Sequence, residues 1–153
     1  SSVLVGGALK LGALVGSASD AEADLIYNFG VNLGIAFQLQ DDYLDCFGDP
    51  EKFGKQVGGD IISNKKTFLM LKALELDSSN LLQSWVDKID FDVSAKVESV
   101  KTIYKDLKVD QLAFELMDAY YQKSIQFLNK INALEDKKKV LQDFASHLMK
   151  RAS

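Results

Sequence analysis

The sequence contains very few of the residues that stabilise small secreted domains or zinc-binding folds. Its 153 residues include one cysteine, one histidine and one proline. A single cysteine excludes an internal disulfide framework, and together with a single histidine it excludes a zinc site made of nitrogen and sulfur ligands. The sequence also has no run of about 18 consecutive apolar residues, so it predicts no membrane span.

The charge balance excludes a large basic surface for nucleic acid. The chain has 18 Lys and Arg against 22 Asp and Glu, for a formal net charge of −4. Its apolar content of 47% and aromatic content of 10% indicate a hydrophobic core rather than disorder. The first residues lack the basic segment of a signal peptide. We therefore expect a soluble, globular chain in the cytoplasm.

The residues that are abundant favour helices, and apolar positions recur at helical spacing throughout. The longest predicted helix begins at Asp20 as its N-cap and extends over 21–47. Gly48 and Pro50 end this helix, and turn residues continue to Gly59. Ser63 is expected to cap the next helix. The predicted later helices cover residues 64–76, 80–89, 93–107, 109–131 and 135–151.

The helical register also predicts which side chains are buried. We expect Cys46 to be a small buried hydrophobic residue rather than a reactive thiol. We expect His147, near the end of the last predicted helix, to lie at the surface. The aromatic residues expected in the core are Trp85, Phe91, Tyr104, Phe114, Tyr120, Tyr121, Phe127 and Phe144.

An acidic face marks the end of the longest predicted helix. Asp41 and Asp45 stand one turn apart on a stripe with Gln38, and Asp42 is offset by about 100°. Gly30 on the same stripe leaves room for a ligand or for a tightly packed helix. Three close carboxylates repel one another unless a cation neutralises them, and oxygen ligands suit Mg²⁺. The alternative is a solvated acidic surface, since short acidic patterns arise by chance.

A glycine-rich basic loop follows this acidic face. It contains Lys55, Asp60 and Lys65 among three glycines. Glycines let the backbone approach a phosphate, and lysines supply positive charge to its oxygens. An acidic face followed by such a loop is the arrangement that a diphosphate with bound Mg²⁺ requires.

Residues 37–69 resemble the second aspartate-rich region of the trans-isoprenyl diphosphate synthases, which include farnesyl and geranylgeranyl diphosphate synthases. The resemblance implies an all-α fold, a helical bundle around a deep cavity. It also implies condensation of an allylic diphosphate with isopentenyl diphosphate, using Mg²⁺ between two aspartate-rich motifs. The matching residues are Phe37-Gln38, Asp41-Asp42-x-x-Asp45, Gly48-Asp49, Gly54-Lys55, Gly58-x-Asp60 and Lys65 followed by Thr67.

The resemblance assigns the charged residues to a metal and a diphosphate. Asp41 and Asp45 would bind Mg²⁺, or Mn²⁺ in its place, and Asp42 would support them. Lys55 and Lys65 would hold the allylic diphosphate and act as catalytic residues.

Four further residues take roles around the substrates by the same resemblance. Gln38, with Phe37 beside it, would line the cavity near the reacting allyl group, and Gln38 would also take part in catalysis. Asp60 would orient the lysines or the loop, and Arg151 would approach isopentenyl diphosphate. The family resemblance also predicts a homo-oligomer, a dimer.

One part of the family pattern is absent. The family has a first aspartate-rich motif well upstream of the second, but only Asp20 and Asp24 precede Asp41. We therefore expect residues 1–153 to be the C-terminal portion of a polyprenyl synthetase domain, inactive by itself. Two alternatives stay open: a non-catalytic homologous subunit that binds a complementary chain, and a helical interaction module whose acidic face binds cations.

Overall fold

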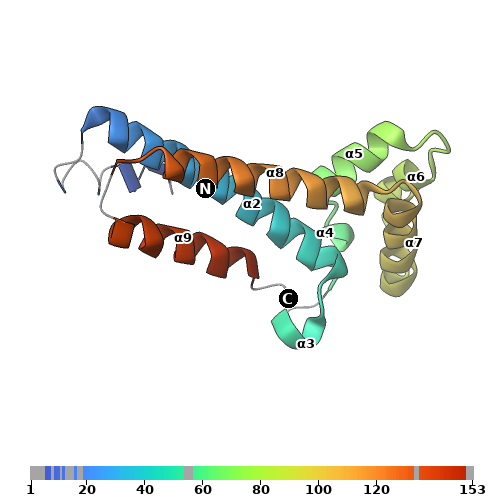
Figure 1. Ribbon diagram of the computed structural model, residues 1–153. Helices are drawn as coiled ribbons and strands as arrows, with labels where there is room; N and C mark the ends of the chain where they lie inside the picture. Colours follow the sequence, from blue (N-terminus) through green and yellow to red (C-terminus); the bar gives the residue numbers. More distant parts are fainter. Residues whose placement is uncertain are drawn as a thin grey trace. The chain divides into compact units, whose positions relative to one another are not determined.

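A computed structural model describes residues 6–7, 9–10, 12, 16, 19–53, 57–132 and 135–150. These residues form helices and no strand, so the predicted all-α class is confirmed. Along this part of the chain, no helix combines the length and the apolar character needed to cross a membrane. The helices are α2 (Asp20–Phe47), α3 (Pro50–Phe53), α4 (Gly59–Ile62), α5 (Phe68–Leu76), α6 (Leu81–Asp87), α7 (Val93–Asp106), α8 (Val109–Asn129) and α9 (Glu135–Lys150) (Figure 1).

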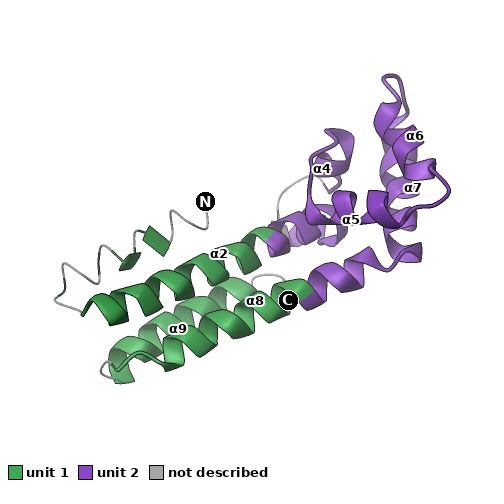
Figure 2. Ribbon diagram, turned by 90° about the horizontal axis from the view of Figure 1, so that it is seen from above, with its two compact units in different colours: residues 1–38, 116–153 green, residues 39–115 purple. Residues whose placement is uncertain are grey.

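The chain divides into two compact units, residues 1–38 with 116–153 and residues 39–115 (Figure 2). The first unit has its own core, in which α2 contributes Phe29 and Leu33, and α8 contributes Leu128. Ile131 and Ala145 complete the buried cluster. Each of these side chains is at most 3% exposed, as the apolar helical spacing requires.

Gly30 in the first unit serves close packing. A Cβ atom at Gly30 would lie 2.8 Å from the Cα of Gly6 and 2.9 Å from Cδ1 of Leu9. A side chain at this position would therefore displace the N-terminal segment. The sequence predicts either a ligand or a tightly packed helix in the space beside Gly30, and the structure shows tight packing.

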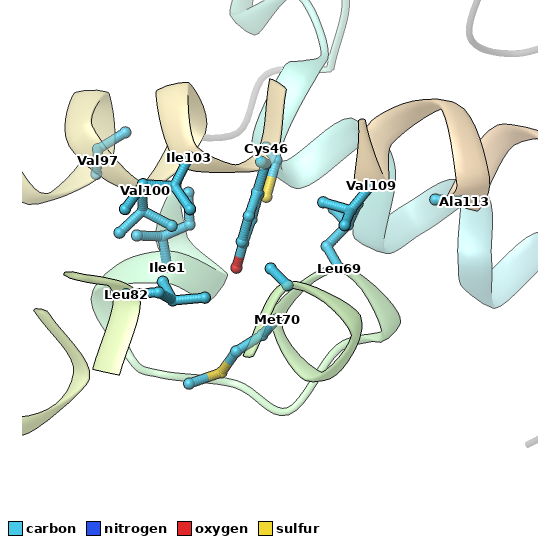
Figure 3. Packing of buried hydrophobic residues seen from close by; sticks show 12 residues of the cluster. Cys46, Ile61, Leu69, Met70, Leu82, Val97, Val100, Ile103, Val109 and Ala113 are labelled. Atoms are coloured by element: carbon cyan, nitrogen blue, oxygen red, sulfur yellow. The ribbon is translucent and has the colours of Figure 1, made fainter. Parts of the chain in front are cut away.

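The second unit is built around α7, which packs against α4, α5 and α6. Its core contains Cys46 from α2, Ile61 from α4, Leu69 from α5 and Val100 from α7 (Figure 3). Cys46 is only 1% exposed, which confirms its prediction as a buried residue. This core fixes the end of α2 and the start of α4 against the same helix.

The segment before α5 differs from the prediction. Ser63 is the C-cap of α4 and not the N-cap of the next helix. α5 begins at Phe68, and its N-cap is Thr67, whose side chain accepts the N–H of Met70 at 3.2 Å. Asn64 adopts a left-handed conformation with φ of 54°, which ends the preceding turn and which asparagine tolerates better than most residues. Two short helices, α3 and α4, also occupy positions where the sequence predicted only turns.

Three further local predictions differ from the structure. α2 is capped by Ser19, whose hydroxyl accepts the N–H of Glu22 at 3.2 Å, one residue before the expected Asp20. Phe114 and Phe144 are 56% and 49% exposed, so their assignment to the core is wrong. Of the other six aromatics, Tyr104 is buried and five are half-buried, and His147 is exposed as predicted.

Candidate functional site

The carboxylate of Asp45 joins the end of α2 to the start of α4. Its Oδ2 atom accepts the backbone N–H of Asp60 at 2.8 Å, and its carbonyl oxygen accepts the N–H of Gly58 at 2.6 Å. Asp45 therefore caps a helix that starts well after it in the sequence. Gly58 permits this turn because its φ is +95° and a Cβ atom would lie 2.8 Å from Val97.

Lys65 brings two further carboxylates into the same group. Its Nζ lies 3.2 Å from Oδ1 of Asp42 and 3.8 Å from Oδ2 of Asp60. The backbone N–H of Lys65 also donates to the carbonyl oxygen of Asp60 at 2.9 Å. The side chain of Lys65 is 50% exposed, whereas that of Asp42 is only 11% exposed. The ammonium is thus held by two carboxylates, while half of the Lys65 side chain is exposed.

The pKa shifts follow from burial and from these neighbours. Burial raises the pKa of Asp60, and the charge of Asp45 raises it further, while Lys65 opposes the shift. The hydrogen bond to Asp42 raises the pKa of Lys65, so its ammonium stays charged at neutral pH. The carboxylates outnumber this lysine, which leaves a negative site that a divalent cation would suit.

The structure brings together four of the predicted site residues, namely Asp42, Asp45, Asp60 and Lys65. Asp41 lies one helical turn before Asp45 on α2 and is half-buried. Phe37, half-buried, and Gln38, exposed, are on α2 within the first unit. Lys55 and Arg151 lie outside the described residues.

No ready-made metal cage is present in the part of the chain that the structure describes. Nowhere in it do three or more His, Cys, Asp or Glu side chains form a group that could hold a metal ion. This observation is compatible with Mg²⁺, which usually takes one or two carboxylates and completes its shell with water and substrate phosphates. The two motif carboxylates on one face of α2 therefore suit a metal that arrives with a phosphate ligand.

Two residues of this region were not predicted to matter. Asn64 precedes Lys65, and its Oδ1 accepts a hydrogen bond from Nζ of Lys96 at 2.7 Å. Lys96 is buried on α7, on the same face as Val100 and one turn before it. A lysine at an apolar position of a helical pattern is the signal that could have revealed this contact.

Comparison with known proteins identifies the family of this chain. Residues 1–107, more than two thirds of the chain, match the family described as Polyprenyl synthetase. The chain belongs to this family. It is 35% identical over 129 residues to the geranylgeranyl diphosphate synthase of Sulfolobus acidocaldarius, covering 83% of this chain and 39% of that protein. It is 38% identical over 128 residues to the farnesyl pyrophosphate synthase of Saccharomyces cerevisiae.

Solved structures of polyprenyl synthetases show the same fold. A crystal structure of a geranylgeranyl pyrophosphate synthase superimposes with a TM-score of 0.90 at 42% identity, covering 99% of this chain and 48% of that one. The geranylgeranyl pyrophosphate synthetase of Pyrococcus horikoshii gives a TM-score of 0.88 at 25% identity. This polyprenyl synthetase chain therefore spans about half the length of these structures and 39% of the Sulfolobus protein.

Proposed function

We propose that this chain holds and helps to ionise an allylic diphosphate, in a prenyltransferase that joins it to isopentenyl diphosphate. Membership of the polyprenyl synthetase family supports this class of reaction. The observation that carries the proposal is the placement of Lys65, whose ammonium is held by Asp42 and Asp60 while half of its side chain stays exposed. A diphosphate oxygen is a suitable partner for such an ammonium.

The carboxylates fit a divalent cation beside this lysine. Asp45 uses Oδ2 for the N–H of Asp60, which leaves Oδ1 for a further ligand. Asp41 stands one helical turn before Asp45 on the same face of α2, and Asp42 is paired with Lys65. We therefore assign Asp41 and Asp45 as the residues that would hold Mg²⁺ or Mn²⁺, with Asp42 supporting them. The cation, when bound, supplies Lewis-acid stabilisation of the negative charge on the diphosphate.

The protein's own residues act on the leaving group. As the bond between the allylic carbon and the diphosphate oxygen breaks, its electron pair leaves with the diphosphate, and Lys65 stabilises the charge that develops there. Lys55 would provide a second ammonium. The double bond of isopentenyl diphosphate then attacks the allylic carbon. A proton passes from the adduct to the departed diphosphate, so the chain grows by one isoprene unit and no side-chain base is needed.

The remaining predicted residues are assigned around the two substrates. Phe37 and Gln38 would line the cavity near the allyl group, and Arg151 would meet isopentenyl diphosphate. Asp60 orients Lys65 through the ion pair and through its carbonyl oxygen. The chain would work in the cytoplasm as part of a homo-oligomer.

Calorimetric titration of the 153-residue chain with inorganic pyrophosphate, in the presence and absence of Mg²⁺, tests this function. Lys65→Met should weaken Mg²⁺-dependent binding roughly tenfold or more, because it removes a charged hydrogen-bond donor. Lys66→Met is the matched control, since Lys66 is also exposed and stands next in the chain. Equal losses in the two variants would contradict the assignment. Binding of Mg²⁺ alone, unaffected by pyrophosphate, would favour the helical interaction module.

A further inference from the structure

A lysine on α7 is buried in the second unit. Lys96 of α7 is only 1% exposed, although a buried ammonium is costly unless it is well partnered. Its Nζ donates to Oδ1 of Asn64 at 2.7 Å and lies 4.3 Å from the centroid of the Phe91 ring. An aromatic face is a favourable surface for a cation. Lys96 is therefore anchored on one side by Phe91 and directed at a single side-chain oxygen.

The partner of Lys96 occupies a special place in the backbone. Asn64 has a φ of 54°, and it directly precedes Lys65. Its Nδ2 atom donates to the carbonyl oxygen of Val86 in α6 at 3.2 Å, while its backbone N–H donates to Ile61 at 3.2 Å. The amide of Asn64 is thus held by α7 on its oxygen side and by α6 on its nitrogen side. These two contacts fix the direction in which the chain leaves α4.

We propose that Lys96 is a positioning residue for Lys65. Through Asn64 it sets the turn from which the ammonium of Lys65 reaches Asp42 and Asp60. The consequence for ligand binding depends on the function proposed above for Lys65. Lys96 is itself buried and bonded to Asn64, so we expect its effect on Lys65 to pass through the loop.

Lys96→Met removes the hydrogen-bond donor while keeping a long, flexible side chain at a buried position. Asn64→Gly removes both side-chain contacts and still allows the left-handed backbone, because glycine adopts a positive φ without strain. Lys88→Met is the matched control, since the Nζ of Lys88 lies over another aromatic ring, that of Trp85, at 3.8 Å. All three variants are compared with the unchanged 153-residue chain at a temperature where each is folded.

Two measurements are made on each variant. The first is the affinity for inorganic pyrophosphate with Mg²⁺, and the second is amide hydrogen exchange at Lys65, whose N–H donates to Asp60. Lys96→Met should weaken pyrophosphate binding about tenfold, which is comparable to the loss seen when a residue that orients a metal ligand is removed. It should also speed amide exchange at Lys65. Asn64→Gly should do the same. The double variant, Lys96→Met with Asn64→Gly, should bind pyrophosphate no more weakly than the weaker of the two single variants. Both substitutions remove the same hydrogen bond, between Lys96 and Asn64.

Several results would overturn the proposal. Lys96 does not act through Asn64 if Lys96→Met leaves both pyrophosphate affinity and amide exchange at Lys65 unchanged. The same conclusion follows if the loss of affinity in the double variant is the product of the two single losses. An equal loss in Lys88→Met would reduce the effect to general destabilisation. If the unchanged chain does not bind pyrophosphate, the proposed function fails, whereas exchange at Lys65 still decides the positioning role. If Lys96→Met does not fold, Asn64→Gly with normal exchange and normal binding contradicts the proposal.

Discussion

Asp60 donates its backbone N–H to Oδ2 of Asp45 at 2.8 Å, although the two residues are 15 positions apart. The same carboxylate belongs to the aspartate-rich face of α2 and caps α4. Lys65 follows α4 and is bonded through its backbone to Asp60. The acidic face and the lysine are thus connected through protein contacts that do not require a ligand.

The first prediction concerns this cap. Asp45→Ala should lower the free energy of unfolding by about 1 kcal/mol, because the N–H of Asp60 loses its acceptor. Asp45→Asn should lower it by less than half as much, since the amide oxygen can still accept that hydrogen bond. Urea denaturation of both variants measures the difference. Equal destabilisation by the two substitutions would show that the hydrogen bond does not stabilise the fold.

The second prediction separates the neighbouring aspartates Asp41 and Asp42. Asp42 is paired with Lys65 at 3.2 Å, so Asp42→Ala should act through the lysine and weaken Mg²⁺-dependent pyrophosphate binding by about 10- to 100-fold. Asp41→Ala should weaken it more and raise the Mg²⁺ concentration required, because Asp41 is assigned to the metal itself. Pyrophosphate titrations at several Mg²⁺ concentrations compare the two, with thermal unfolding as the control. Equal or reversed losses at matched stability would contradict the assignment.

The third prediction concerns the thiol of Cys46. Burial raises its pKa to about 12, and the charges of Asp45 and Asp60 contribute to the shift, because the thiolate would be both desolvated and repelled. The thiolate fraction at mildly alkaline pH is therefore far below that of a thiol with the ordinary pKa of 9.0. Ellman's reagent should therefore react slowly with the folded chain and rapidly in guanidinium chloride. Rapid reaction of the folded chain would mean that Cys46 is accessible.

The fourth prediction is a pH dependence that originates at Asp60. Burial raises its pKa above 3.8, so the folded state binds this proton more tightly than the unfolded state. The contribution of Asp60 to the free energy of unfolding should therefore fall as pH rises from 3.8 through the raised pKa. Subtracting the stability of Asp60→Asn from that of the unchanged chain isolates this slope. Asp90→Asn, which changes an exposed carboxylate, should retain it. A difference that increases with pH would reverse the sign and contradict the prediction.

The sequence predicted most helices because their signal is local. Apolar residues at helical spacing placed α2 and α7 to α9 within a few residues of their observed ends. The turn at Asn64 was missed because its determinant is distant: Lys96, which bonds to it, is 32 residues away. The local sequence by itself favours a helix that starts after Ser63. The hydrogen bonds from Lys96 and to Val86 favour the left-handed turn instead.

The candidate site was predictable as a set of residues but not as an arrangement. The spacing of Asp41 and Asp45 on one helix placed them on one face, which is a local property. That Asp42 pairs with Lys65, and that Asp45 caps α4, depends on how the loop returns to α2. The exposure of Phe114 was missed for a similar reason, since helical register shows which residues share a face but not what covers that face.

The last prediction is that the 153-residue chain does not condense an allylic diphosphate with isopentenyl diphosphate by itself. The resemblance implies that the metals of this reaction lie between two aspartate-rich motifs, and the sequence contains one, at Asp41 to Asp45. One carboxylate face would bind Mg²⁺ and a diphosphate, as proposed above, but the metal ligands of the other motif would be missing when charge develops on the leaving group. Binding of pyrophosphate without turnover is therefore expected.

Incubation of the purified chain with Mg²⁺, radiolabelled isopentenyl diphosphate and dimethylallyl diphosphate tests this prediction, with extraction of the prenyl product as the readout. Calorimetric binding of pyrophosphate by the same preparation shows that the site is folded, so that an absence of product has a chemical cause. Lys65→Met controls for a contaminating synthase, because a contaminant's activity would not change with this substitution. Mg²⁺-dependent prenyl transfer that the unchanged chain performs and Lys65→Met loses would show that a single aspartate-rich face is sufficient for catalysis.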